Sequence, residues 1–276
     1  MSWIGKLSLR YTRDGERTIA LDRHEGPLRV LQRLYPEGPG VCHHVLVHPP
    51  GGIVGGDVLE IDATLDTGTH ALITTPGATR FYRSSGAAAS QRARLRLVSG
   101  ARLEWLPLET IAYSGCVAEN GVRFELERGA EMIGWDLLAL GLPAAGAPFD
   151  AGCFTQQIEW PGRWLERGRI DAADTRLLDS PLGLAGRRVM ATAWYASGSP
   201  LAAGLDDRLL EAARGAAAAS PLAVCCGATC LRSGLVVLRA LAPRVEPAMA
   251  LLQLVHAAWR REAWALAAHT PRLWST

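Results

Sequence analysis

The sequence lacks the long apolar runs that a membrane-spanning helix requires. None of its 276 residues lies in an uninterrupted apolar run of the ~18 to 20 residues that cross a bilayer. The most apolar stretches, 137–148 and 212–226, are broken by proline, glycine or Arg214. The first ten residues alternate like a strand and carry no secretory signal. These absences predict a cytoplasmic protein that has no membrane partner.

An excess of charge of either sign is also absent. Lys and Arg number 29 against 27 Asp and Glu, which leaves a formal net charge of +2. A nucleic-acid-binding surface needs clustered basic residues, whereas the arginines here are scattered along the chain. The composition therefore predicts no nucleic-acid partner.

Cysteine is present but lacks the pattern of a disulfide framework or a zinc site. There are six cysteines, and the closest group is Cys225, Cys226 and Cys230. That group has neither a second cysteine pair nor a flanking histidine. We expect free thiols, most of them buried.

The familiar phosphate-binding and hydrolase motifs are missing as well. Two glycine-rich segments, 48–57 (HPPGGIVGGD) and 74–85 (TTPGATRFYRSS), superficially suggest a nucleotide site. A phosphate-binding loop ends in Gly-Lys-Ser/Thr and enters a helix, but here Asp57 follows the glycines and 58–65 alternates like a strand. No Gly-x-Ser-x-Gly elbow surrounds the serines of the second segment. The glycines are expected to form turns between strands.

What the sequence does contain is many short strand-like segments. Turn signals recur about every ten residues up to roughly position 195. This spacing predicts a mainly β protein, either a sandwich or a β-helical, solenoid-like body of many short strands, although no clean repeat is visible. The clearest expected strands are 7–11, 18–21, 41–47, 58–65, 70–74, 93–98 and 122–126.

The C-terminal third changes character. Residues 205–219 and 249–268 have the composition and spacing of two α-helices, and 230–241 returns to a strand pattern. Trp259, Trp264 and Trp274 are expected to pack against the β body. No linker interrupts the chain, so we predict one domain over 1–276, strand-rich in 1–200 and helix-containing in 201–276.

Among the histidines, His48 is the stronger candidate metal ligand from its context, and Cys42 with His44 could chelate an ion only if the strand bends. Cys42, His44 and His48 share one face of a strand, but His44 and His48 are ~13 Å apart and cannot bind one ion together. His48 can equally hold the Pro-Pro turn that follows it. His43 and His70 occupy ordinary strand settings.

The carboxylates are more informative, since several interrupt apolar or rigid segments. Asp57 follows a glycine turn, Asp136 lies in the apolar run 132–140, and Glu166 stands beside two arginines. One interpretation is a set of buried ion pairs, for example Asp136 with an arginine. The other is a polar path through an apolar body, whose oxygen ligands pass on a hydrated divalent ion.

Together, these segments resemble the urease accessory protein UreD (UreH) family. The strongest matches are 48–57 and 74–85, and the resemblance extends over nearly the whole chain. Further matching segments are LEWLP at 103–107, ETI at 109–111, GWDL at 134–137 and, more weakly, LGLP at 140–143, LER at 165–167 and PRLWST at 271–276.

The resemblance implies a β-helical body with two helices and a non-enzymatic role. Proteins of this family bind apo-urease and recruit a UreF-type protein, which recruits the GTPase UreG, so that nickel reaches the urease active site. Asp57, Asp136 and Glu166 match acidic family positions associated with the nickel path. The implied cofactor is therefore transient Ni²⁺, with none tightly bound.

The chain departs from the family pattern at Leu142, where an arginine is usual, and at Leu108, where a glutamine is usual. The missing arginine removes one expected ion-pair partner of Asp136. Two other functions stay open: an assembly scaffold that nickel never contacts, and a β-helical carbohydrate-active enzyme that uses Asp136 and Glu166 as its two carboxylates.

Overall fold

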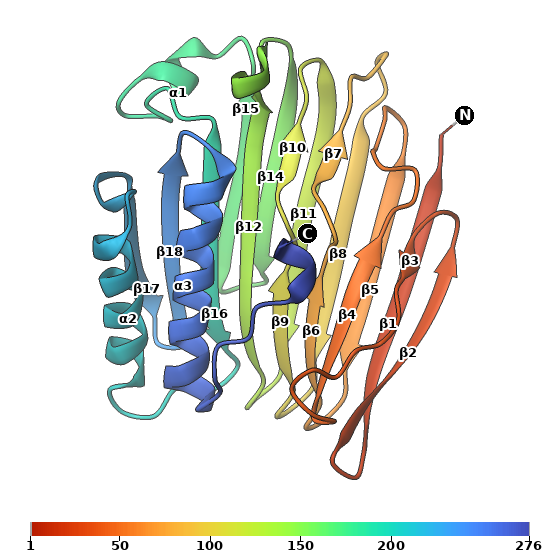
Figure 1. The fold of residues 1–276 in the computed structure, drawn as a ribbon, viewed down its shortest axis with the longest axis vertical. Coiled ribbons are helices and arrows are strands. Elements are labelled where there is room, and N and C mark those ends of the chain that lie inside the picture. Colours follow the sequence, from red (N-terminus) through yellow and green to blue (C-terminus); the bar gives the residue numbers. More distant parts are fainter. Residues whose placement is uncertain (1, 276) are drawn as a thin grey trace.

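Two stacked β-sheets form the body of the protein, and a helical layer covers one of them (Figure 1). The structure is a computed structural model and describes residues 2–275. In this part of the chain the first sheet has seven strands in the order β15-β14-β11-β8-β5-β1-β2. Their bounds are β1 (Ile4–Asp14), β2 (Arg17–Glu25), β5 (Val58–Leu65), β8 (Ala89–Leu97), β11 (Cys116–Leu126), β14 (Gly152–Trp160) and β15 (Trp164–Asp171).

The second sheet has eleven strands within the described residues, eight of them in the order β17-β18-β16-β12-β9-β6-β4-β3. Strands β10 and β13 pair with β12, and β7 pairs with β10. Their bounds are β3 (Arg29–Val30), β4 (Val41–Val47), β6 (His70–Thr74), β7 (Thr79–Phe81), β9 (Arg102–Leu106), β10 (Thr110–Ala112), β12 (Glu131–Leu142), β13 (Ala147–Pro148), β16 (Val189–Ser197), β17 (Cys226–Arg232) and β18 (Leu235–Ala242).

From β4 to β14 the chain winds between the sheets like a solenoid. Strands β4, β6, β9 and β12 lie in the second sheet and pair in parallel, while β5, β8, β11 and β14 alternate with them along the chain and pair in parallel in the first. Each turn of the chain therefore stacks on the preceding one and buries its apolar face. This arrangement confirms the mainly β, solenoid-like fold class.

Strand alternation gives each sheet a buried inner face. In β5 every second residue is buried, because successive side chains point to opposite sides. The inner faces of the two sheets enclose one apolar cluster, and a second cluster lies between the outer face of the second sheet and the helices. Strand β12 is buried on both faces except at its ends, so its sequence is a nearly continuous apolar run without the alternation typical of a half-buried strand.

The two expected C-terminal helices are present, but the second begins and ends earlier than the expected range 249–268. Helix α2 spans Leu205–Ala219, as predicted, whereas α3 spans Val245–Trp264. The longer helix begins before Pro247, since a proline in the first turn removes no intrahelical hydrogen bond. It ends at Trp264, and the residue that follows, Ala265, caps it in a left-handed conformation at φ 53°.

Further elements differ from the sequence expectation. A short helix, α1 (Thr175–Asp179), is capped by the Asp174 side chain, which accepts the Leu177 N–H. The strand expected at 230–241 is the hairpin β17–β18, turning at Gly234 with φ 79°. Short 3-10 turns are η1 (Pro143–Ala145), η2 (Ala223–Cys225) and η3 (Arg272–Ser275).

The expectation of free thiols is confirmed, but only half of the cysteines are buried, since Cys225, Cys226 and Cys230 are partly exposed. All six cysteines are free, and Cys42, Cys116 and Cys153 are buried. Trp259 and Trp264 are buried beneath the helical layer. In the described chain no helix combines the length and the apolar character that crossing a bilayer takes.

Candidate functional site: a polar cavity between the sheets

A cavity of about 230 Å³ opens between the inner faces of the two sheets. Its mouth is formed by His48, the Gly51–Gly52 turn and the segment 75–80. Apolar residues such as Ile61 and Trp105 line its walls, while Gln91, Asn120 and Asp136 line its interior. The glycine-rich segments singled out in the sequence therefore form the entrance to a cavity that contains several polar side chains.

A row of amide side chains crosses the first sheet at this level. Gln91, Asn120 and Gln156 occupy paired positions on β8, β11 and β14, so parallel register places them side by side. The Gln91 Nε2 donates to Asn120 Oδ1 at 3.3 Å. Strand alternation turns all three toward the second sheet, because their neighbours two residues away belong to the inner core. The sheets thus enclose a line of hydrogen-bonding groups within an apolar body.

Asp136 faces this row from β12 in the second sheet. It is 8% exposed and accepts a hydrogen bond from Asn120 Nδ2 at 3.5 Å. The Gln156 amide lies close enough to lower the Asp136 pKa, although its two polar atoms meet no partner with hydrogen-bond geometry in the described chain. No arginine pairs with Asp136 among residues 2–275, so the ion pair suggested from the sequence is wrong for this residue.

Burial is the main cause that raises the pKa of Asp136, to about 7, and the negative charge of Glu166 raises it further. Near neutral pH the carboxyl therefore lies close to the point where it gains or loses a proton. A carboxylate oxygen without a countercharge at the end of a polar cavity is a suitable ligand for a cation.

Glu166 lies farther along β15 and carries the ion pair that Asp136 lacks. The Arg239 Nε, from β18, donates to its two carboxylate oxygens at 2.9 and 3.1 Å. Thr192 Oγ1 donates to Glu166 at 3.5 Å. Because Arg239 and Thr192 belong to the second sheet, Glu166 links the two sheets. Glu166 therefore forms an ion pair with Arg239, but this pair is partly exposed and not buried as the sequence interpretation expected.

Asp57 has a different environment from the other two carboxylates. It is 2% exposed, and its oxygens accept the main-chain N–H groups of Trp3 at 2.8 Å and Val54 at 3.0 Å. The carboxylate closes the glycine turn and fixes the N-terminal segment to the start of β5. Asp57 does not line the cavity between the sheets.

His48 lies at the cavity mouth, and Asp57 acts on it electrostatically. Burial lowers the pKa of His48, and the Asp57 carboxylate opposes that shift. The imidazole is therefore neutral near pH 7, the form in which it binds a metal ion. The structure thus places His48 and Asp136 around one cavity, couples Glu166 to Asp136, and leaves Asp57 beside the entrance with both oxygens occupied.

A second polar cluster lies on the outer face of the second sheet, and few features of the sequence indicated it. Glu104 is wholly buried and accepts hydrogen bonds from His70 at 2.8 Å and His256 at 2.5 Å. Arg260, also wholly buried, lies with Nε 3.6 Å from Glu104 and donates from Nη2 to Glu37 at 2.5 Å. The available signals were a glutamate inside the apolar segment 103–106 and an arginine on the apolar face of α3.

The remaining candidates from the β4 strand are structural. Cys42 belongs to the inner core, and the His44 Nδ1 meets the Tyr11 hydroxyl at 2.8 Å. Burial lowers the pKa of His44 to about 4, which keeps its ring neutral. His43 points to the opposite face and belongs to the outer polar cluster, so its setting is not the ordinary one expected from the sequence.

The fold and the cavity define a class of protein: a parallel β-helical body with a helical layer on one face and a carboxylate-containing polar interior. The family model described as UreD urease accessory protein matches residues 4–275. The chain belongs to this family.

Similar proteins extend over the full length of the chain. A protein of Leptothrix cholodnii is 63% identical over 278 residues, one of Variovorax paradoxus 58% over 276, and one of Polaromonas naphthalenivorans 57% over 275. Each alignment covers 100% of both chains, and each of these relatives is named urease accessory protein UreD.

Proposed function

We propose that this protein acts in urease maturation as a non-enzymatic scaffold for nickel insertion. In this role it binds apo-urease and a UreF-type accessory protein, and through the latter a UreG-type GTPase. The family match over residues 4–275 supports the role in maturation, as do full-length relatives named urease accessory protein UreD. Nickel is the cargo, so its contacts with the chain are transient.

The cavity between the sheets is the proposed route for nickel. The observation that carries this proposal is Asp136, a buried carboxylate without a countercharge in the described chain, placed at a cavity beside a row of amides. Carboxylate and amide oxygens bind divalent ions less tightly than thiolate or multiple-imidazole sites do. A hydrated ion can therefore pause at Asp136 and move on.

His48 and Glu166 extend the route on either side of Asp136. The neutral imidazole of His48 offers a nitrogen ligand at the entrance. Glu166 binds a passing ion only after it releases Arg239, whose side chain is 46% exposed and can turn toward solvent. Because such exposed ion pairs contribute only ~0 to 1 kcal/mol, the exchange of arginine for a metal ion costs little. Asp57 serves by holding the entrance turn in place.

The test is the nickel content of urease purified from cells that express its operon with or without this chain. We expect little nickel without the chain and recovery when the wild-type chain is supplied. D136N and E166Q should lower the nickel content several-fold, because each removes a charged oxygen ligand. D207N is the matched control, since Asp207 is an exposed acid in the first turn of α2.

Co-purification of the variants with the partner proteins separates the two parts of the proposal. An intact complex with poor nickel loading supports the route through Asp136. An intact complex with full loading in both variants would leave only the assembly scaffold. Equal nickel in urease made with and without the chain would contradict a role in maturation altogether.

A further inference from the structure

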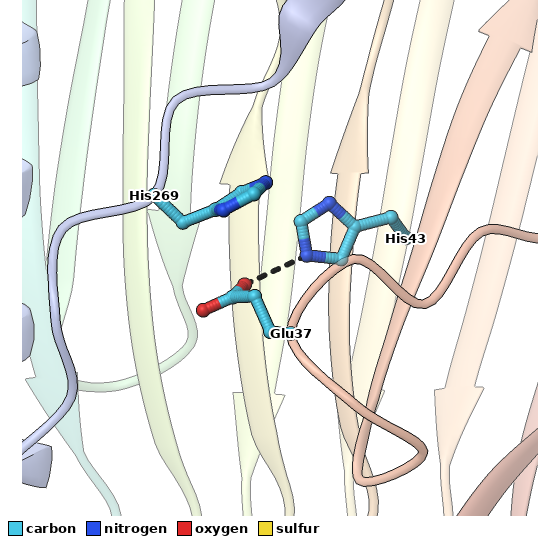
Figure 2. Close-up of side chains that lie close together, drawn as sticks. All are labelled: Glu37, His43 and His269. Atoms are coloured by element: carbon cyan, nitrogen blue, oxygen red, sulfur yellow. Dashed lines mark hydrogen bonds and ion pairs between the residues drawn. The ribbon is translucent and has the colours of Figure 1, made fainter.

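Three metal-ligating side chains converge on the outer face of the second sheet, away from the cavity between the sheets. Figure 2 shows Glu37, His43 and His269 directed toward one another from three separate segments. One ligand atom from each residue lies within 4.8 Å of the other two. The His43 Nε2 meets Glu37 Oε1 at 2.8 Å, and the His43 and His269 rings approach edge to face at 5.1 Å between centroids.

Each of the three residues has a distinct structural support. His43 projects from β4 and is 4% exposed. Glu37 lies in the loop before β4, where Arg260 of α3 donates to its second oxygen, Oε2. His269 belongs to the segment that follows α3 and crosses the second sheet (Figure 1), and it is half-buried. Two of the three side chains are thus held firmly, while the third arrives from an irregular segment.

The charge balance around the group favours a cation. Two carboxylates, Glu37 and Glu104, share one guanidinium, that of Arg260. Counted over these three groups alone, the formal charge is −1.

We propose that Glu37, His43 and His269 form a binding site for a divalent transition-metal ion. Two ligands that are each about 2.1 Å from one ion are separated by roughly 3.0 to 3.4 Å, close to the His43–Glu37 distance of 2.8 Å. A small movement of the 265–271 segment brings the His269 ring to the third position. The ion then fastens this segment to β4.

The donor set defines the metal class. Two imidazoles and one carboxylate suit Ni²⁺, Zn²⁺, Co²⁺ or Cu²⁺, whereas Mg²⁺ and Ca²⁺ prefer oxygen ligands alone. Three protein ligands leave further positions for water, so the bound ion exchanges with its surroundings. This site does not depend on the proposed route through Asp136, because the two lie on opposite faces of the second sheet.

The experiment is a titration of the full-length chain with Ni²⁺ and Zn²⁺, after purification through a tag that contains no histidine. We expect the wild-type chain to bind one ion that H269Q and H43Q bind at least tenfold more weakly. H24Q is the matched control, since His24 lies exposed on β2. D136N should retain this ion, which separates the site from the cavity between the sheets.

Absorption spectra of the Co²⁺-bound protein and competition by Mg²⁺ give two further measurements of the site that a folding defect would not reproduce. The wild-type chain with Co²⁺ should show ligand-field bands of a nitrogen-containing site, and H269Q, whose fold is checked by circular dichroism, should lack them. Millimolar Mg²⁺ should leave the bound ion in place. Wild-type binding by H269Q, loss of the ion in D136N alone, or displacement by Mg²⁺ would each overturn the proposal.

Discussion

Three acidic residues that look alike in the sequence have three different environments. Asp57 gives both oxygens to main-chain N–H groups, Glu166 pairs with an arginine from the opposite sheet, and Asp136 meets only a side-chain amide at 3.5 Å. A carboxylate already satisfied by the backbone has little capacity left for an ion. At the scale of single residues, Asp136 is therefore the group best suited to contact the cargo.

The raised pKa of Asp136 makes stability depend on pH. A carboxyl whose pKa rises on folding, from ~4 to about 7, favours the native state less as pH increases between these values. Relative to D136N, the free energy of unfolding of the wild type should fall by roughly 4 kcal/mol between pH 4 and 7 and then level off. Urea unfolding of both proteins at several pH values measures this difference, and parallel stability curves would contradict it.

At the scale of elements, strands β12 and β16 approach each other closely at Gly134. A Cβ added at Gly134 would lie 2.4 Å from the ring of Trp194, which is wholly buried. The two residues are directly paired across the strands. The absence of a side chain at position 134 is what allows the indole to lie over the strand.

Substitution of this glycine should therefore destabilise the protein. We expect G134A to lower the free energy of unfolding by about 1 to 3 kcal/mol, since the rigid indole cannot move aside without disturbing the core. G168A in β15 is the control, because a Cβ there meets nothing within 4 Å. Denaturant unfolding of both variants measures the two free energies of unfolding. Equal decreases in G134A and G168A would show that the effect comes from strand propensity and not from the contact with Trp194.

The junction of α3 with the second sheet depends on the buried charges of Glu104 and Arg260. Burial by itself would raise the Glu104 pKa, but hydrogen bonds from His256 and His70 outweigh it and the pKa is lowered. E104Q removes one negative charge facing the buried guanidinium. Removing one member of a buried ion pair typically costs about 3 to 5 kcal/mol, which is the loss we expect.

The pH dependence of this loss has the opposite sign to that of Asp136. A depressed carboxyl pKa stabilises the native state above the ordinary pKa of glutamate, ~4.3, and this contribution disappears as pH falls toward the folded value. The difference between the wild type and E104Q should therefore shrink below about pH 4. E246Q, at an exposed position on the same helix, should change stability by less than about 0.5 kcal/mol.

At the scale of the whole molecule, the C-terminal segment covers part of the second sheet that α2 and α3 leave open (Figure 1). Trp274 donates from its indole nitrogen to Thr74 Oγ1 at 2.9 Å, and its ring lies 5.3 Å from that of Trp135. Trp135 in turn donates to the carbonyl of Pro107, which lines the cavity between the sheets. The segment thus connects the outer polar cluster to the wall of the cavity.

Removal of residues 265–276 should leave the β body folded but expose its apolar face. All the strands and α3 end before this segment, so the far-UV circular dichroism should be kept. Loss of the Trp274 contacts should lower the free energy of unfolding by roughly 1.5 to 3 kcal/mol and increase binding of a hydrophobic dye. W274A should reproduce most of both effects, and an unchanged melting temperature would show that the segment covers nothing essential.

The sequence by itself determined the β-rich class, several strands and the first long helix, because these depend on local periodicity. The ranges 41–47, 58–65, 70–74 and 205–219 have the bounds that alternation, helical spacing and turn residues indicate. Local patterns also indicated that Asp136 stands in an apolar run. Strand β12 was not recognised as a strand, since burial on both faces removes the alternation that identifies one.

Only the tertiary structure decided which side chains meet. Glu166 pairs with Arg239, which lies 73 residues later in the chain. Glu104 contacts His256 over a separation of 152 residues, and Glu37 contacts Arg260 over a separation of 223 residues. These contacts follow from parallel coil stacking and from the return of α3 and the C-terminal segment over the second sheet. Because periodicity fixes the face on which a side chain lies but not its partner across a sheet, the polar cavity and the outer histidine cluster emerge only when the sheets and helices are assembled.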